Sequence, residues 1–211
     1  MRLSFRFIFL LAVAGMFSFC STHKPKKSIA DLRTAFNYES GSAEKYNKFA
    51  ETAMKEGYDT LAQLFMACAK SENIHAANHA KVIENLGEDI GITETAIFEV
   101  KSTTENLKAA IKSEIYQMQT IYPGFIRDAE NEKAPEAARS FTWAWDSEKK
   151  HLKYYRMASS VISGGNENNL PFNWLVCPNC GNTFSPADLK DRCDFCLAKQ
   201  ERFIGYQPKQ E

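Results

Sequence analysis

The chain has 211 residues, of which 44% are hydrophobic, and it carries 26 basic and 26 acidic side chains. A chain of this length can bury one core of medium size. It can also carry a small second domain, which needs a cross-link such as a metal ion to be stable. The balanced charge provides no basic field to gather phosphate backbones, so we expect no nucleic acid partner.

Residues 1–19 have the composition of an export signal. Arg2 and Arg6 precede an apolar run from Phe7 to Phe17, which is too short to span a bilayer comfortably. We therefore do not count this segment as part of the fold.

Cys20 closes the apolar run and is followed by Ser21 and Thr22. The arrangement resembles the cleavage and lipidation site of a bacterial lipoprotein, with Phe19 where a small residue is usual. The alternative is an uncleaved segment that anchors the chain in a membrane. We expect an exported protein, held by a lipid on Cys20 at the periplasmic side of a membrane.

Residues 20–28 include a polar stretch without apolar periodicity, and we expect a solvated tether there. Beyond it, apolar residues recur every three or four positions over residues 29–55 and again over residues 60–86, which predicts two helices. Gly57 ends the first of these helices and Gly87 ends the second, so the two helices should form a hairpin.

Residues 88–105 make a poor helix by pattern and are predicted to form a long crossover. A third helix over residues 106–130 should kink at Pro123, and a fourth covers residues 135–162. Residues 29–163 are thus predicted to form a ferritin-like four-helix bundle, with Cys68 packed in its core as a small hydrophobe.

Two Glu-x-x-His motifs, Glu72/His75 and Glu148/His151, lie on the second and fourth predicted helices. Positions i and i+3 share a helix face, so each motif can point a carboxylate and an imidazole inward together. One such motif alone is more often a solvated face or a core histidine. Two of the four histidines in the chain fall in this pattern, which favours a shared metal site.

The first and third helices each carry a lone carboxylate, Glu39 and Glu114, that interrupts an apolar face. A buried unpaired charge is costly, and a metal cation removes that cost. With the two Glu-x-x-His motifs, these residues form the ligand set of a carboxylate-bridged di-metal bundle. Four carboxylates balance two divalent ions such as ferrous iron. His79 has no evident partner and is predicted to lie at the surface, the alternative being a place beside the ligands.

Four of the six cysteines form two Cys-x-x-Cys pairs after the last helix: Cys177, Cys180, Cys193 and Cys196. Two such turns facing each other give a closed four-thiolate site suited to iron or zinc, and two disulfides are the alternative. We expect a linker over residues 164–173 and a small metal-stapled β domain over residues 174–211. That domain has few apolar residues, so it should need its metal to fold.

With both sites in this order, the chain resembles the rubrerythrin family, a ferritin-like di-iron bundle fused to a rubredoxin-like domain. The resemblance covers residues 29–206 and rests on the following stretches: 38–40, 71–76, 113–116, 122–123, 147–152 and the two cysteine pairs. It implies that Glu72 and Glu148 bridge two irons, that Glu39 and Glu114 are terminal ligands, and that His75 and His151 supply nitrogen. Tyr46 and Tyr122 match tyrosines beside the ligands.

One ligand position departs from the family pattern. The third helix of the family usually reads Glu-x-x-Glu, whereas here Glu114 is followed by Gln117. In the family this second carboxylate exchanges with the histidine of the second helix as the redox state changes. We expect His75 to stay bound throughout, and the reduced state to be relatively favoured.

The resemblance implies a peroxidase that reduces hydrogen peroxide to water in oxidative-stress defence, with electrons relayed through the four-cysteine iron from an unidentified donor. It also implies a homodimer, in which the rubredoxin-like iron lies near the bundle of the partner subunit. The alternatives are a non-enzymatic metal carrier with a structural zinc ribbon, or a ferroxidase that consumes oxygen.

Overall fold

A computed structural model of the chain describes residues 24–92, 96–165 and 167–208. The predicted export signal and Cys20 lie outside the described residues. Within them, no helix combines the length and the apolar character needed to cross a membrane.

The first two helices form the predicted hairpin. Helix α1 spans Lys26–Lys55 and α2 spans Asp59–Asn85. Gly57 lies in the turn with φ of 83°, a conformation that costs glycine little. Helix α1 begins inside the predicted tether because the carboxylate of Glu132, far along the chain, accepts hydrogen bonds from the backbone N–H groups of Lys27 (3.0 Å) and Ser28 (2.7 Å).

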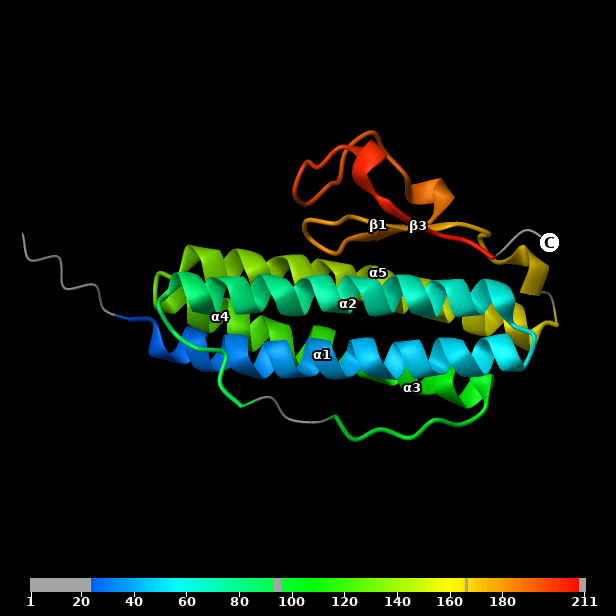
Figure 1. Ribbon diagram of the computed structural model, residues 1–211, viewed down its shortest axis with the longest axis horizontal. Coiled ribbons are helices and arrows are strands. Elements are labelled where there is room, and N and C mark those ends of the chain that lie inside the picture. Colours follow the sequence, from blue (N-terminus) through cyan, green and yellow to red (C-terminus); the bar gives the residue numbers. More distant parts are fainter. Residues whose placement is uncertain (1–23, 93–95, 166, 209–211) are drawn as a thin grey trace, which may run out of the picture.

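The described parts of the crossover lie along the outside of α1, and the crossover ends earlier than predicted (Figure 1). Helix α3 spans Thr103–Tyr116, because Ser102 and Glu105 form a capping box at its start. The Ser/Thr cluster assigned to the crossover is therefore the beginning of the third helix. Gly41 lets the crossover approach α1, since a Cβ there would lie 2.7 Å from that of Ala96.

The third helical segment changes from an α-helix to a π-helical turn before Pro123. A π-helical turn, Gln117–Ile121, joins α3 to α4, which spans Tyr122–Asn131. Proline lacks an N–H group and crowds the carbonyl four residues earlier, so a wider turn relieves the predicted break. Helix α5 spans Pro135–Ser163 and completes the bundle.

The bundle interior holds an aromatic cluster beside the predicted ligands. Tyr46, Phe49, Phe65 and Tyr155 are all 0–1% exposed, and the Tyr46 and Tyr155 ring centroids lie 5.5 Å apart. Cys68 is fully buried in the same core, as predicted. This packing keeps bulk water away from the middle of the bundle.

The C-terminal domain is a three-stranded antiparallel sheet with two cysteine turns. Its strands are β1 (Trp174–Val176), β2 (Thr183–Phe184) and β3 (Ile204–Tyr206), in the order β2-β1-β3. The predicted linker contains a short helical turn, Glu167–Asn169, and Glu167 accepts a hydrogen bond from the Thr60 backbone N–H at 3.1 Å.

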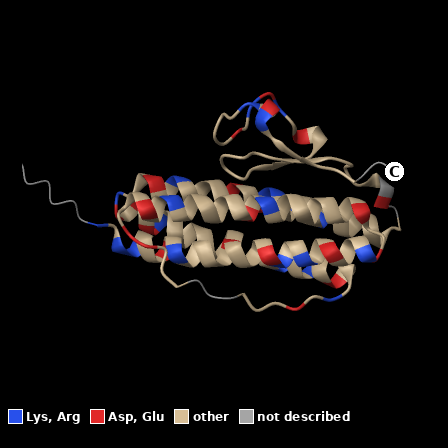
Figure 2. Ribbon diagram, in the orientation of Figure 1, with Lys and Arg blue, Asp and Glu red and all other residues tan. Residues whose placement is uncertain are grey.

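This domain packs on α2 and α5 of its own chain (Figure 1). The rings of Tyr154 and Trp174 lie 4.8 Å apart, Lys153 pairs with Asp188 at 3.0 Å, and Asn78 donates to the backbone of Asn179 at 3.0 Å. These contacts lie within one chain, and the expected contact with the bundle of a partner subunit stays a prediction. Basic and acidic residues are interspersed along the helices and do not separate into different parts of the ribbon (Figure 2).

Candidate di-metal centre and four-cysteine site

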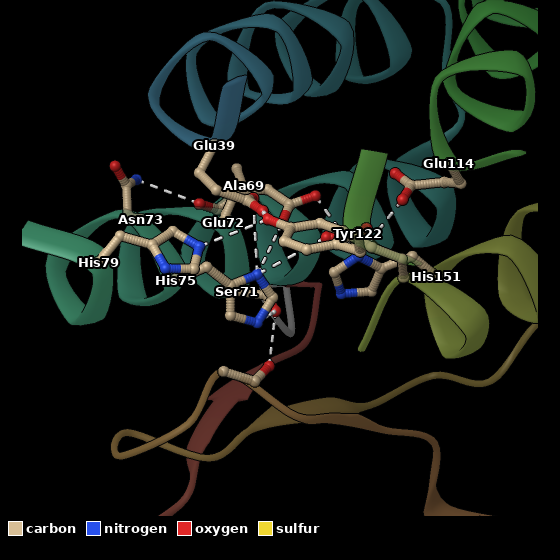
Figure 3. A network of polar contacts seen from close by, with 12 residues as sticks. Glu39, Ala69, Ser71, Glu72, Asn73, His75, His79, Glu114, Tyr122 and His151 are labelled. Carbon is tan, nitrogen blue, oxygen red and sulfur yellow. Dashed lines mark hydrogen bonds and ion pairs between the residues drawn. The ribbon is translucent and has the colours of Figure 1, made fainter. Parts of the chain in front are cut away.

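The six predicted ligands of the bundle come together in its interior. Their exposed fractions are 0–1%: Glu39, Glu72, His75, Glu114, Glu148 and His151. In Figure 3, Glu39 and Glu114 reach in from α1 and α3, and the two imidazoles lie between these carboxylates and the C-terminal domain. Each residue faces inward because the helical period places it on the apolar stripe of its helix.

One group of ligand atoms surrounds Nδ1 of His75. This nitrogen lies 3.0 Å from Oε2 of Glu72, 3.5 Å from Oε2 of Glu39 and 3.7 Å from Oε1 of Glu148. The candidate ligand atoms of the four residues all lie within 4.8 Å of one another. They can hold one metal ion.

A second group surrounds Nδ1 of His151. It lies 3.2 Å from Oε2 of Glu148, 3.4 Å from Oε1 of Glu72 and 3.9 Å from Oε2 of Glu114. Glu72 and Glu148 thus belong to both groups, and each offers one oxygen to either side. This is the arrangement expected of two bridging carboxylates between two metal ions, with Glu39 and Glu114 as the terminal ones.

The carboxylates have the unsatisfied oxygens that a metal would use. One oxygen of each of Glu39, Glu72, Glu114 and Glu148 is buried without a hydrogen-bond partner among the described residues. Two divalent cations would satisfy these oxygens and neutralise the four charges, so the residues fit the metal pair.

Burial and mutual repulsion shape the pKa values of this cluster. Burial, with the charges of Glu72 and Glu148, raises the pKa of Glu39 well above its usual range. Burial and Glu148 do the same for Glu114, and burial and Glu72 raise the pKa of Glu148. Burial also disfavours the charged form of Glu72, but His151 and His75 outweigh it and lower the pKa of that carboxyl. Without cations, three of the four carboxyls therefore favour their protons.

Two tyrosines hold the terminal carboxylates. The hydroxyl of Tyr46 donates a short hydrogen bond to Oε1 of Glu114, and the hydroxyl of Tyr122 donates one to Oε1 of Glu39. Each bond leaves Oε2 of the same carboxylate directed at its histidine. The matched tyrosines thus orient the ligands.

The prediction that His79 lies at the surface is wrong. Its side chain is fully buried, its Nδ1 lies 2.8 Å from the hydroxyl of Ser140, and its Nε2 lies 3.4 Å from that of Tyr122. Burial, with a smaller effect of His75, lowers the pKa of His79 to about 3. The partner was not evident in the sequence because Ser140 is on α5.

Gln117 is 2% exposed, and its amide nitrogen and oxygen have no hydrogen-bond partners among the described residues. It lies one turn after Glu114, at the start of the π-helical turn, and lines a cavity of about 550 Å³ that opens to the surface. Lys45, Tyr38 and Tyr116 line the same cavity, as does the crossover at residues 96–98. The position that departs from the family pattern is thus a buried residue that lines an open cavity one helical turn from Glu114.

The four cysteines also come together. Sγ of Cys177 lies 3.4 Å from Sγ of Cys196, and Sγ of Cys180 lies 3.4 Å from Sγ of Cys193. Sulfurs around a tetrahedral metal at about 2.3 Å would be about 3.8 Å apart, so a small adjustment admits the ion. Hydrogen bonds from Cys177 and Cys180 lower the pKa of Cys193, whereas Cys177 and Cys193 raise that of Cys180. A bound cation allows all four thiols to ionise.

Sequence reasoning missed the residues that join the two sites. Nε2 of His75 lies 3.4 Å from the Ser71 hydroxyl, and Nε2 of His151 lies 3.0 Å from the Thr183 hydroxyl. Gly181 packs on the His75 ring so closely that an added Cβ would lie 2.4 Å from Nε2. The one available signal was the four-residue spacing of Ser71 and His75 on a helix, and nothing local pointed to Thr183.

The fold and the site define a class: a four-helix bundle with a carboxylate-bridged pair of metal ions, joined to a small four-cysteine metal domain. A sequence model of the Rubrerythrin family matches residues 31–159. The chain belongs to the rubrerythrin family. The predicted family and the predicted fold class are confirmed.

Individual relatives agree with this assignment. Rubrerythrin-2 of Clostridium acetobutylicum is 30% identical over 83% of this chain and 94% of its own length, and rubrerythrin of Porphyromonas gingivalis is 32% identical over 85% and 90%. A solved structure of nigerythrin in a mixed-valence state superposes with a TM-score of 0.75, at 28% identity over 85% of this chain and 86% of that one. As in rubrerythrin and nigerythrin, the bundle carries a di-iron site and the C-terminal domain carries a four-cysteine metal site.

Proposed function

We propose that this protein reduces hydrogen peroxide to water at the bundle site. Rubrerythrins are generally peroxide-reducing oxidoreductases, and the chain keeps the arrangement that this chemistry needs. The observation that carries the proposal is the pair of four-ligand groups that share Glu72 and Glu148, because it places two metal ions side by side. When bound, the iron pair supplies the two electrons that cleave the O–O bond.

The protein's own residues supply orientation and protons. Reduction of one peroxide to two waters takes up two protons, and the hydroxyls of Tyr46 and Tyr122 hold protons against the Oε1 atoms of Glu114 and Glu39. The aromatic cluster around Tyr46 keeps bulk water out, which strengthens the electrostatic interactions inside the site.

The cavity beside Gln117 is the proposed route for peroxide. It opens between α1, α3 and the crossover, and Gln117 stands at its buried end. The Gln117 amide can donate to one peroxide oxygen and accept from the other, because neither of its polar atoms has another partner among the described residues. Lys45, which donates to the Ser113 hydroxyl at 2.8 Å, places a cation beside the same route.

We propose that the four-cysteine site holds iron and passes electrons inward within one chain. Gly181 follows Cys180 directly and packs on His75, which makes the covalent and contact path between the two sites short. The same contact favours a His75 that stays bound in every redox state. Its ring has little room to swing, and Gln117 offers no carboxylate to replace it.

An anaerobic experiment tests this function. Iron-loaded, fully reduced protein is mixed with stoichiometric hydrogen peroxide, and the visible absorption of the thiolate-bound ferric centre is followed. Rapid colour is expected, because electrons leave the four-cysteine iron for peroxide through the bundle. A Glu148→Gln variant, which alters one bridging carboxylate, should colour far more slowly at equal iron loading of the cysteines.

Three results would contradict this proposal. If iron loads but no colour develops with peroxide, the metal-carrier or the ferroxidase alternative replaces the proposal. If oxygen produces colour faster than peroxide does, the protein is a ferroxidase. Zinc in the cysteine site of the native protein would also contradict the relay, because zinc does not change its oxidation state.

We further propose that an unidentified donor reduces the protein and that a second copy pairs with it. We also propose that the protein is exported, lipidated on Cys20 and held at the periplasmic side of a membrane. The support is the charged and apolar pattern of residues 1–19. Metabolic labelling with a fatty acid, compared between the natural chain and a Cys20→Ala variant, should show a label that the variant lacks. Equal labelling of both would contradict lipidation at Cys20.

A further inference from the structure

Both ligand histidines are held by the same backbone carbonyl of the C-terminal domain. The Ser71 hydroxyl donates to the carbonyl oxygen of Gly181 at 2.6 Å, and the Thr183 hydroxyl donates to that oxygen at 3.3 Å. A hydroxyl that donates its proton to Gly181 keeps lone pairs that can accept from the imidazole beside it. These imidazole contacts are Nε2 of His75 at 3.4 Å and Nε2 of His151 at 3.0 Å.

This arrangement favours a proton on Nε2 of each imidazole. When Nε2 donates to the hydroxyl, Nδ1 keeps a lone pair, and Nδ1 is the nitrogen that faces the carboxylates in both groups. A partner on the far nitrogen sets the tautomer and the orientation of a metal-binding histidine. Ser71 and Thr183 are both fully buried, so water does not compete for these bonds.

The position of Gly181 depends on the first cysteine turn. Its N–H donates to the carbonyl of Cys177 at 3.0 Å, and the N–H of Cys177 donates to the carbonyl of Asn182 at 2.9 Å. Gly181 adopts φ of 80° directly after Cys180. Metal binding by Cys177 and Cys180 holds this turn closed, and the domain has few apolar residues to hold it otherwise.

We propose that residues 177–183 are a positioning element of the bundle's metal site, so that filling the four-cysteine site strengthens metal binding in the bundle. Ser71, Gly181 and Thr183 are positioning residues, because they act on the metals through the two histidines. Two sites that share one structural element are coupled, and the coupling is reciprocal. Metal bound in the bundle therefore also strengthens metal binding by the four cysteines.

The test measures affinity for a metal that needs no redox chemistry. The full chain is loaded with a single equivalent of Zn²⁺, which thiolates prefer, and the bundle is titrated with Mn²⁺, which prefers carboxylates, while free Mn²⁺ is read by electron paramagnetic resonance. A Thr183→Val variant should bind Mn²⁺ about tenfold more weakly, and Ser71→Ala should weaken it similarly. A matched control is Thr142→Val, whose hydroxyl donates to the carbonyl of Ala138 within α5 at 2.8 Å, and it should bind Mn²⁺ as the natural chain does.

The coupling is tested with a Cys193→Ser/Cys196→Ser variant that cannot close the cysteine site. Its Mn²⁺ affinity should fall at least about fivefold while its helical circular dichroism stays unchanged, and Mn²⁺ should slow extraction of Zn²⁺ from the natural chain. Affinities within about twofold of the control in all three variants would overturn the proposal. Because no peroxide is used, this result is independent of the proposed enzymatic function.

Discussion

The two metal sites of this chain are built in opposite ways. The bundle site takes its ligands from four helices that are held by a large apolar and aromatic core, so the helices bring the ligands together before any metal arrives. The four-cysteine site takes its ligands from two local turns in a domain whose core includes the cysteines themselves. The bundle therefore folds and thereby creates its metal site, whereas metal binding by the four cysteines makes the C-terminal domain fold.

The two cysteine turns of the C-terminal domain differ in whether they contact the bundle site, and single residues show this difference. Gly181 and Leu197 each follow the second cysteine of a pair, and both have positive φ, 80° and 61°. Leucine is tolerated in the second turn because it points to solvent and is 67% exposed. The first turn allows only glycine, because the His75 ring occupies the space of a side chain.

Chelation should separate the two sites most clearly. Removing all metal should unfold the C-terminal domain, which relies on metal binding worth about 10 kcal/mol or more in small zinc domains, and should leave the helices folded. Hydrogen exchange is expected to accelerate sharply at the amides of Cys177, Gly181 and Leu197 while the middle of α2 stays protected. Cooperative loss of protection in both parts would contradict the comparison.

Gly181→Ala should have the next largest effect. The new Cβ would lie 2.4 Å from Nε2 of His75 and 3.1 Å from the Ser71 carbonyl, in a backbone conformation that disfavours alanine. Overpacking and the left-handed backbone together should cost about 3 kcal/mol in docking of the C-terminal domain. Thermal unfolding of the metal-loaded protein would show it, and Leu197→Ala is the matched control that should change little. Equal effects of the two variants would mean that the His75 contact imposes no constraint.

The helical segments and the residues of both metal sites could largely be predicted from the sequence. Helical periodicity located the four segments. The Glu-x-x-His and Cys-x-x-Cys spacings singled out eight residues, and the carboxylates of Glu39 and Glu114 on apolar faces added two, all of which the structure gathers into two clusters. These signals are local, because a helix face or a turn sets the relation of residues three or four apart. Sequence position alone could therefore indicate which side chains face inward.

The rest depends on contacts between distant segments. The sequence offered no partner for His79, because Ser140 is 61 positions away. The early start of α1 depends on Glu132, about a hundred residues later. The hydroxyl of Thr183, which accepts from His151, belongs to another domain, and threonine is too common for its presence to indicate a role.

Gln117→Glu tests the bundle site on its own. A fifth carboxylate should stabilise the oxidised metal pair and lower its reduction potential, because a nearby negative charge favours the more positive state. Spectroelectrochemistry of the di-iron site would measure the shift, with Gln119→Glu, on the exposed face of the same turn, as the control. An unchanged or raised potential for Gln117→Glu would contradict the role assigned to the missing charge.

Metal binding in the bundle should release protons. The raised pKa values of Glu39, Glu114 and Glu148 mean that the metal-free protein retains protons on these carboxyls at a pH where free carboxyls have lost them. The metal must displace those protons, so its affinity should fall as the pH falls. Calorimetry of Mn²⁺ binding in two buffers of different ionisation enthalpy would count the protons. A Glu114→Gln variant should release fewer, and an affinity independent of pH would show that the carboxyls are already ionised.

The smallest effect is expected at the second turn. Leu197→Gly relieves a left-handed backbone that costs a side-chain-bearing residue about 1–2 kcal/mol, offset by the greater freedom of glycine in the unfolded chain, about 0.5–1 kcal/mol. Because Leu197 is largely exposed, little apolar burial is lost, and the zinc-loaded C-terminal domain should gain about 0.5 kcal/mol. Denaturant unfolding would measure the gain, followed by the fluorescence of Trp174 in a Trp143→Phe/Trp145→Phe background. A clear loss of stability would mean that the Leu197 side chain packs in solution, and that the two turns differ less than their surroundings indicate.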